Sequence, residues 1–140
     1  MTVSILIDTN VVLDFAMKRG EFFAPADRIM KEIVEGRLSG YVSASQVTDI
    51  YYFLEKRFSH AKAVEEIANL IASIHVIGVD RKTIEAAIKS EMLDFEDAVQ
   101  TIAAKDCDID VVVTRDPEGY CNSGLQIYSP GEFLKTLITR

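Results

Sequence analysis

Short apolar runs and amphipathic stripes alternate along the whole chain. Val3–Ile7 is an almost unbroken β-prone run, which is typical of a central strand that is buried on both faces. Later runs of similar length follow at intervals, and the last of them is the weakest. The predicted strands are Val3–Ile7, Ser39–Val42, His75–Val79, Asp110–Thr114 and Leu125–Tyr128.

Between these runs, apolar residues recur at the three- and four-residue spacing of helices. Asn10 suits the N-cap of a first helix that reaches about Met17. Ser43 and Gln46 resemble a capping box that opens a helix with an apolar stripe. The other predicted helices lie between Pro25 and Gly36, around Val64–Ile71, over Thr83–Met92, over Phe95–Lys105 with Asp94 as cap, and after Pro130.

This alternation predicts an α/β fold with a mostly parallel central sheet of about five strands and helices on both faces. The sequence contains no repeat, low-complexity tract or Gly/Ser linker, so we expect a single domain over residues 1–140. In open sheets of this kind, functional sites lie beyond the carboxyl ends of the strands. Acidic residues that follow strands should therefore gather at that edge.

The composition of the chain fits an ordinary globular domain. Its 140 residues are 49% hydrophobic and 26% charged. Asp8 interrupts the first apolar run too early for a signal peptide, and no run approaches the roughly 20 apolar residues of a membrane span. Cys107 and Cys121 have no metal-ligand spacing, which indicates buried or idle thiols in a reducing cytoplasm.

The net charge argues mildly against a nucleic-acid partner. With 22 acidic residues against 15 basic ones, the formal charge is −7. Nonspecific binding of nucleic acids rests on Lys and Arg side chains that meet phosphates. A nucleic-acid function would therefore need a local basic rim or metal ions that invert the field at one place.

Aspartates nevertheless stand where such a site is expected. Asp8 ends the first strand, and its side chain should emerge at the carboxyl edge of the sheet. Asp94 and Asp97 share one face of a helical first turn, so Asp94 can act as the cap while Asp97 projects into a site. Asp116 ends the fourth strand, although its Asp-Pro-x-Gly context also suits a type I turn.

Two further aspartates carry weaker signals. Asp49 lies off the apolar stripe of the third helix, where an aspartate is most often a solvated surface residue. Asp14 stands four residues before Lys18, so a surface ion pair explains it simply. Arg115 neighbours Asp116 and is the best candidate for a phosphate contact beside the acids.

Four segments, taken in order, resemble the motifs of PIN-domain ribonucleases. They span nearly the whole chain, and the ordered set is more specific than any single motif. The segments are Ile7–Asp14, Asp94–Ala104, Val112–Asp116 and Tyr128–Leu134.

The resemblance implies a Rossmann-like, three-layer fold and a Mg²⁺- or Mn²⁺-dependent endoribonuclease. By position, Asp8, Asp97 and Asp116 would be the metal-site aspartates, and Asp49 falls where the family commonly has a glutamate. Asn10, Asp94 and Thr114 would support the acids. Many small bacterial relatives are toxins of the VapC-like group, so an RNA substrate, a cognate antitoxin and a homodimer are the implied partners.

The proposed chemistry suits this set of residues. Hard divalent cations prefer oxygen ligands, and metal-assisted hydrolysis requires no histidine or lysine base. A phosphatase of the HAD-like class would want a second aspartate where Asn10 stands, and a receiver domain would want paired acids ahead of the first strand. A non-catalytic PIN-like binding module stays open because of Asp49 and the acidic net charge.

Overall fold

Strand β1 (Val3–Ile7) lies at the centre of a five-stranded sheet with the order β3-β2-β1-β4-β5. The computed structural model describes residues 2–138. Every neighbouring pair of strands is parallel, so the sheet is wholly rather than mostly parallel. All five predicted strands are present, and the other four are β2 (Leu38–Ser43), β3 (His75–Ile77), β4 (Val111–Val113) and β5 (Gln126–Tyr128).

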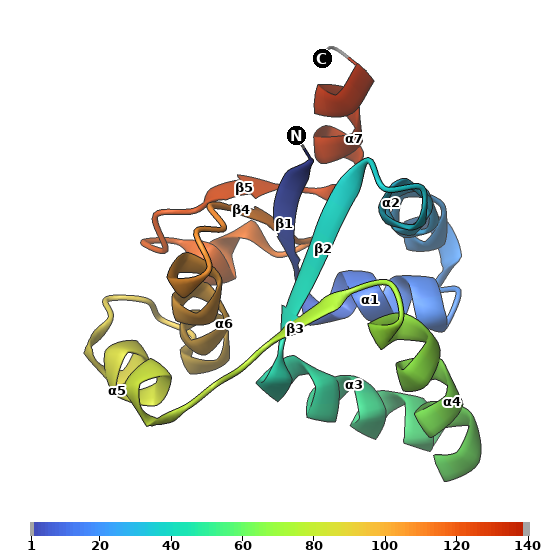
Figure 1. The fold of residues 1–140 in the computed structure, drawn as a ribbon, viewed down its shortest axis with the longest axis horizontal. Helices are drawn as coiled ribbons and strands as arrows, with labels where there is room; N and C mark the ends of the chain where they lie inside the picture. The colour runs from blue at the N-terminus through green and yellow to red at the C-terminus, as the bar shows by residue number, and fades with distance from the viewer. Residues whose placement is uncertain (1, 139–140) are drawn as a thin grey trace.

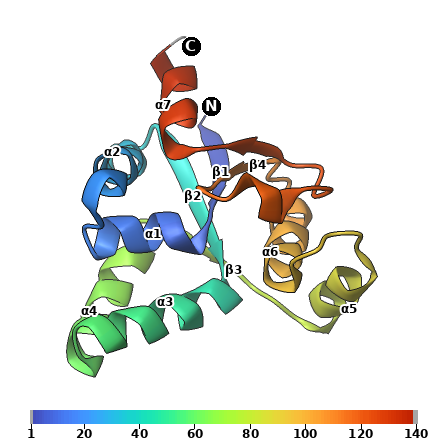
Figure 2. The same ribbon diagram turned by 180° about the vertical axis from the view of Figure 1, so that it is seen from behind.

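Helices cover both faces of this sheet (Figures 1 and 2). Helices α1–α4 and α7 lie on one side, and α5 and α6 lie on the other. The three-layer α/β arrangement predicted from the sequence is therefore confirmed. The helices are α1 (Thr9–Ala16), α2 (Phe23–Val34), α3 (Ala44–Arg57), α4 (His60–Ile71), α5 (Arg81–Lys89), α6 (Phe95–Asp106) and α7 (Pro130–Ile138), with short 3-10 turns η1 (Gly20–Phe22) and η2 (Pro117–Tyr120).

The side chains of β1 alternate between two apolar cores. Ile5 and Ile7 pack in the core formed with α1, α2 and α7, while Leu6 packs on the opposite face. There Leu6 meets Ala103 and Ala104 of α6, whose small side chains fit a close approach of helix and sheet. All of these strand residues are fully buried. This two-sided burial explains why the first apolar run has no polar alternation.

A buried glutamine joins the start of α3 to the end of β1. Ser43 and Gln46 form the predicted capping box. The Gln46 side chain accepts a hydrogen bond from the Ser43 amide at 2.7 Å and donates one to the Ile7 carbonyl at 2.7 Å. It also donates to Thr9 Oγ1 at 3.3 Å. The first turn of α3 is therefore tied to the segment that carries Asp8.

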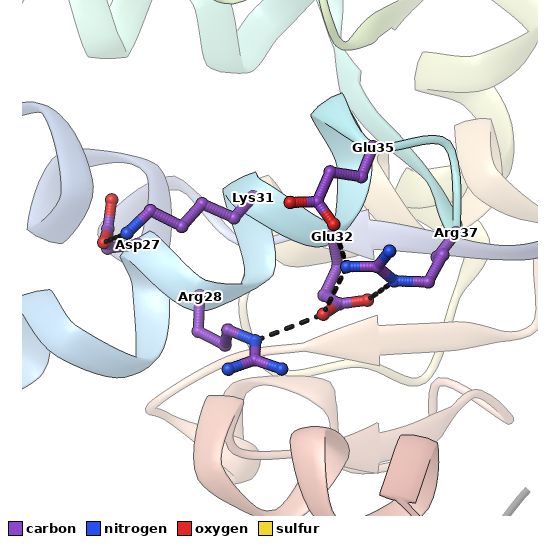
Figure 3. Close-up of polar contacts among 6 residues, drawn as sticks. All are labelled: Asp27, Arg28, Lys31, Glu32, Glu35 and Arg37. Carbon is purple, nitrogen blue, oxygen red and sulfur yellow. Dashed lines mark hydrogen bonds and ion pairs between the residues drawn. The ribbon is translucent and has the colours of Figure 1, made fainter.

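A second buried polar group connects α2 with β2. Glu32 is 5% exposed and accepts hydrogen bonds from Arg28 at 3.1 Å and from Arg37 at 2.5 Å. Figure 3 shows both guanidinium groups directed at Glu32, with Glu35 on the far side of Arg37. The hydrogen bonds from Arg37 lower the pKa of Glu32 below its ordinary value. The network fixes the turn that leads from α2 into the sheet.

The start of α1 differs from its prediction. Asp8, not Asn10, occupies the N-cap position, although the Asp8 side chain makes no capping hydrogen bond. Its carboxylate oxygens instead accept hydrogen bonds from two other side chains. Asn10 lies inside the first turn and accepts a hydrogen bond from Arg19 Nη1 at 3.2 Å.

Among residues 2–138, no helix is both long and apolar enough to cross a membrane.

Candidate active site

Residues from distant parts of the chain line one pocket at the carboxyl edge of the sheet. The pocket has a volume of about 420 Å³, and its walls come from the ends of β1 and β4 and from helices α3 and α6. Figure 1 shows α3 and α6 on either side of this edge. No Lys or Arg side chain of the described residues lines it. Its six acidic residues are Asp8, Asp49, Asp94, Glu96, Asp97 and Asp116.

Asp8 is the most firmly held of these acids. It is 7% exposed, and its Oδ2 accepts a hydrogen bond from Thr114 Oγ1 at 2.8 Å, while Oδ1 accepts one from the Tyr120 hydroxyl at 3.0 Å. Burial raises the pKa of Asp8 above its ordinary value, the two hydrogen bonds oppose that rise, and the charge of Asp116 adds to it. Thr114 Oγ1 also accepts a hydrogen bond from the Asp116 amide at 2.9 Å. Thr114 thus contacts the carboxylate of Asp8 and the backbone of Asp116.

Asp97 projects into the pocket from the first turn of α6. Asp94 caps this helix by accepting a hydrogen bond from the Asp97 amide at 2.9 Å, as the sequence predicted. Burial raises the pKa of Asp97 to about 7, followed in effect by the charges of Asp8, Asp94 and Asp116. Carboxylates from three separate segments therefore act on one another across this pocket.

Asp49 lies on the α3 wall of the pocket, apart from this group. Its charge is the main cause of the raised pKa of Glu96. It is not among the charges that raise the pKa of Asp8 or of Asp97. Asp49 and Glu96 are thus an acidic pair next to the first group, which consists of Asp8, Asp97 and Asp116, and the charge of Glu96 also contributes to the raised pKa of Asp97.

The oxygen donors of the first group suit a hard divalent cation in kind and in charge. Within residues 2–138, no group of three or more His, Cys, Asp or Glu side chains is already arranged as a set of metal ligands. Mg²⁺ usually keeps several waters and takes only one or two carboxylates, so its binding does not require such a preformed cage. The donor set therefore fits a hydrated cation held by Asp8 and Asp97, with Asp116 beside it.

Residues 4–118 match the family model described as the PIN domain. The chain belongs to the PIN-domain family. PIN-domain proteins are typically nucleases, so membership supports a nuclease role in general terms. A comparison with curated protein sequences finds no match.

Several solved structures share the fold of this chain. VapBC2 from Rickettsia felis, bound to a DNA fragment from its promoter, is 10% identical with a TM-score of 0.71, over 91% of this chain and 98% of that one. FitAcB from Neisseria gonorrhoeae is 17% identical with a TM-score of 0.69, over 91% and 98%. VapC20 from Mycobacterium tuberculosis, a sarcin–ricin loop cleaving toxin, is 18% identical with a TM-score of 0.67, over 84% and 93%. At these identities the likeness shows the fold.

The structure of this PIN domain adds residues that the sequence did not single out. Tyr120 is 1% exposed, and its hydroxyl also lies 2.6 Å from Oε1 of the buried Gln100. A Cβ atom at Gly119 would overlap the Asp97 carboxylate, so glycine leaves that acid its place. The sequence offered turn chemistry as a sufficient reason for Gly119, and nothing marked Tyr120 as a partner of Asp8.

Two charged residues of the PIN domain are placed differently from their predictions. Asp14 is 1% exposed and forms ion pairs with Arg115 and Arg19, so the expected surface pair with Lys18 is wrong. The guanidinium of Arg115 donates to both Asp14 oxygens, at 2.6 and 3.1 Å, and lies 3.9 Å from the ring centre of Phe22. Arg115 is thus held by protein groups and does not line the acidic pocket, and its contact with a phosphate stays a prediction. The thiols of Cys107 and Cys121 are free and exposed rather than buried.

Proposed function

We propose that this chain is a Mg²⁺- or Mn²⁺-dependent endoribonuclease that hydrolyses phosphodiester bonds of RNA. One observation carries the proposal: Asp8, Asp97 and Asp116 come from three segments and line one pocket, where burial and their charges raise the pKa of Asp97 to about 7. Such crowding of carboxylates costs stability unless a counter-charge is bound. Perturbed acids in a cleft are typical of functional sites.

The chain's own residues would hold and orient the reacting groups. When bound, a divalent cation supplies positive charge that stabilises the charge developing on the phosphate. Thr114 and Tyr120 fix the Asp8 carboxylate, so this ligand needs no reorganisation when a cation arrives. Asp97 would complete the site from α6. Gln100 contacts the Tyr120 hydroxyl through Oε1 and helps to keep it in place.

The decisive experiment is a cleavage assay on structured RNAs in Mn²⁺ and in Mg²⁺. We expect cleavage by the unmodified protein and none by Asp8→Asn. The amide side chain of this variant can still accept from Thr114 and can donate to Tyr120, whose hydroxyl then turns to Gln100. The variant should therefore fold, and its loss of activity would report the missing charge.

Asp106→Asn is the matched control, because Asp106 ends the same helix as Asp97 but is exposed and outside the pocket. It should cleave like the unmodified protein. A chain that binds RNA but cleaves none in either metal would instead be a binding module. Equal activity of Asp8→Asn and the control would remove the acidic pocket from the chemistry.

We further propose that the chain is the toxin of a toxin–antitoxin pair, since one solved structure of similar fold, from Klebsiella pneumoniae, is described as a toxin–antitoxin complex and another, VapC20, as a toxin. An apolar pocket of about 220 Å³ between α1, α2, α3 and α4 could receive a segment of such a partner. Its walls include Val12, Phe15 and Met30. Co-purification with the product of the neighbouring gene would test this, and failure to co-elute would remove the toxin role alone.

A further inference from the structure

Two large aromatic side chains stand exposed on the α3 wall of the acidic pocket. Tyr52 is 50% exposed and Phe53 is 43% exposed. Both line the pocket together with Asp49, which precedes them on the same helix. Neighbouring exposed aromatic rings on a protein surface often mark a binding site rather than a fold requirement. Because they share the pocket with the acids, a ligand at the acids would also meet these rings.

The two rings are arranged to receive a flat ligand. Their centres lie 5.5 Å apart, and their planes meet at 78°. A planar ring that stacks on Phe53 or Tyr52 would therefore have the edge of the other ring as a neighbour. Lys56 extends from the next turn, and its ammonium lies 4.6 Å from the centre of the Tyr52 ring. An aromatic surface with a cation at its rim suits the base and the phosphate of a nucleotide.

Charge makes such a surface necessary for a nucleic-acid substrate. The pocket carries six acidic residues, and the chain has a net charge of −7. Both repel the phosphate backbone, so electrostatic attraction gives little affinity. Stacking on aromatic rings does not depend on net charge, and every base offers a ring face. Bases within a duplex have these faces covered by their neighbours, whereas unpaired bases can be splayed out.

We propose that Tyr52 and Phe53 form a stacking surface for an unpaired RNA base next to the phosphodiester bond at the acids, and that Lys56 contacts the adjoining phosphate. This inference rests on the proposed ribonuclease function and deepens it, because it names the substrate as RNA that is single-stranded at the cleaved position. The surface holds the base, while the acids act on the phosphate. A second copy of the chain packed against these rings is the competing occupant.

The test uses short single-stranded RNA labelled with a fluorophore, and its duplex form. Affinity is measured by fluorescence anisotropy in an Asp97→Asn background, which blocks cleavage. We expect Phe53→Leu and Tyr52→Leu each to weaken binding of the single strand at least about fivefold. Phe58→Leu is the matched control, since Phe58 follows the last turn of α3, is 41% exposed and lies outside the pocket. It should bind within about twofold of its parent.

Cleavage kinetics give an independent measurement in the otherwise unmodified protein. Phe53→Leu should raise KM at least about fivefold and change kcat little, because stacking supports binding rather than the chemical step. Removal of one base from the substrate, leaving an abasic position beside the cleaved bond, should have the same effect. Combining the variant with the abasic substrate should add little, because both remove the same contact.

Each contrary result has a definite meaning. Binding and KM of Phe53→Leu and Tyr52→Leu equal to the control would overturn the stacking surface, as would equal affinity for duplex RNA. If these two substitutions convert a dimer to a monomer and leave the RNA affinity unchanged, the rings belong to a contact between two copies of the chain. If the rings govern RNA binding but no RNA is cleaved, the nuclease proposal fails and the stacking surface stands. Cleavage that is indifferent to the rings leaves the nuclease and removes the surface.

Discussion

Asp97→Asn should stabilise the metal-free protein at alkaline pH. The Asp97 carboxyl has a pKa raised from its ordinary value of 3.8 to about 7 by burial and by neighbouring acids. Its ionised form is therefore disfavoured in the folded protein relative to the unfolded chain. Asparagine has nearly the same shape and no charge. The Asp97 side chain accepts no hydrogen bond from the other described residues, and only its amide donates to Asp94.

The magnitude follows from the pKa of Asp97. A rise from 3.8 to about 7 corresponds to at most about 4 kcal/mol, at about 1.4 kcal/mol for each pH unit. Asp97 is only partly buried, so solvent screening reduces this to about 1–3 kcal/mol. Because the folded-state pKa is the higher one, the cost is absent below about pH 3.8, grows through the window from 3.8 to 7, and is complete above pH 7.

Thermal unfolding in EDTA at pH 4 and at pH 8 measures this effect. At about 3 °C per kcal/mol, the variant should melt about 3–9 °C higher at pH 8 and at nearly the same temperature at pH 4. Mn²⁺ should raise the Tm of the unmodified protein more than that of the variant, because the ion offsets the same repulsion. Asp106→Asn serves as control, with no change at either pH. Lower stability of Asp97→Asn at pH 8, or a gain of equal size at both pH values, would refute the reasoning.

Three further substitutions probe the supports of the site. Gly119→Ala should leave the Tm nearly unchanged but reduce Mn²⁺-dependent cleavage at least about tenfold, since its Cβ displaces the Asp97 carboxylate; full activity would argue against that placement. Tyr120→Phe removes a hydrogen-bond donor to Asp8 and should lower the free energy of unfolding in urea by about 1–3 kcal/mol. Because that hydrogen bond lowers the pKa of Asp8, its loss should also move the pH profile of cleavage to higher pH. Asp14→Asn should lower the free energy of unfolding by about 2–4 kcal/mol, because two arginines then lose their buried, charged partner, whose side chain is 1% exposed. A loss below about 0.5 kcal/mol, roughly that of a surface ion pair, would contradict this.

Local patterns predicted the fold well because each depended on neighbours in sequence. Val3–Ile7 is predicted and observed with the same bounds, since an apolar run of that length has few alternatives. Ser43 with Gln46 and Asp94 with Asp97 were recognised from a three-residue spacing that a helix start imposes. The prediction of Asn10 as the N-cap of α1 is wrong because two polar residues compete for that position. Asp8 occupies it, and its side chain is held there by hydrogen bonds from distant residues.

The supports of the site depended on contacts that sequence spacing does not encode. Asp8 and Tyr120 are separated by 112 positions, and Asp14 and Arg115 by 101. A nearby Lys18 gave Asp14 a local explanation, and only the folded chain shows that a distant arginine takes that role. Parallel strands brought Asp8 and Asp116 to the same edge, so the acids themselves could be anticipated while their partners could not.

The Gln46 bridge between α3 and β1 gives the pocket a fixed length scale. The Gln46 side chain, on α3, forms hydrogen bonds of 2.7 Å with the amide of the N-cap residue Ser43 and with the Ile7 carbonyl at the end of β1, and so sets the distance between the aromatic wall and the acidic edge. In an RNA chain bound along the pocket, that distance would fix the spacing between the stacked base and the cleaved bond. Gln46→Ala would remove these hydrogen bonds and let that distance vary. Cleavage should then occur at several neighbouring bonds and give products of mixed length, before the reaction itself is lost.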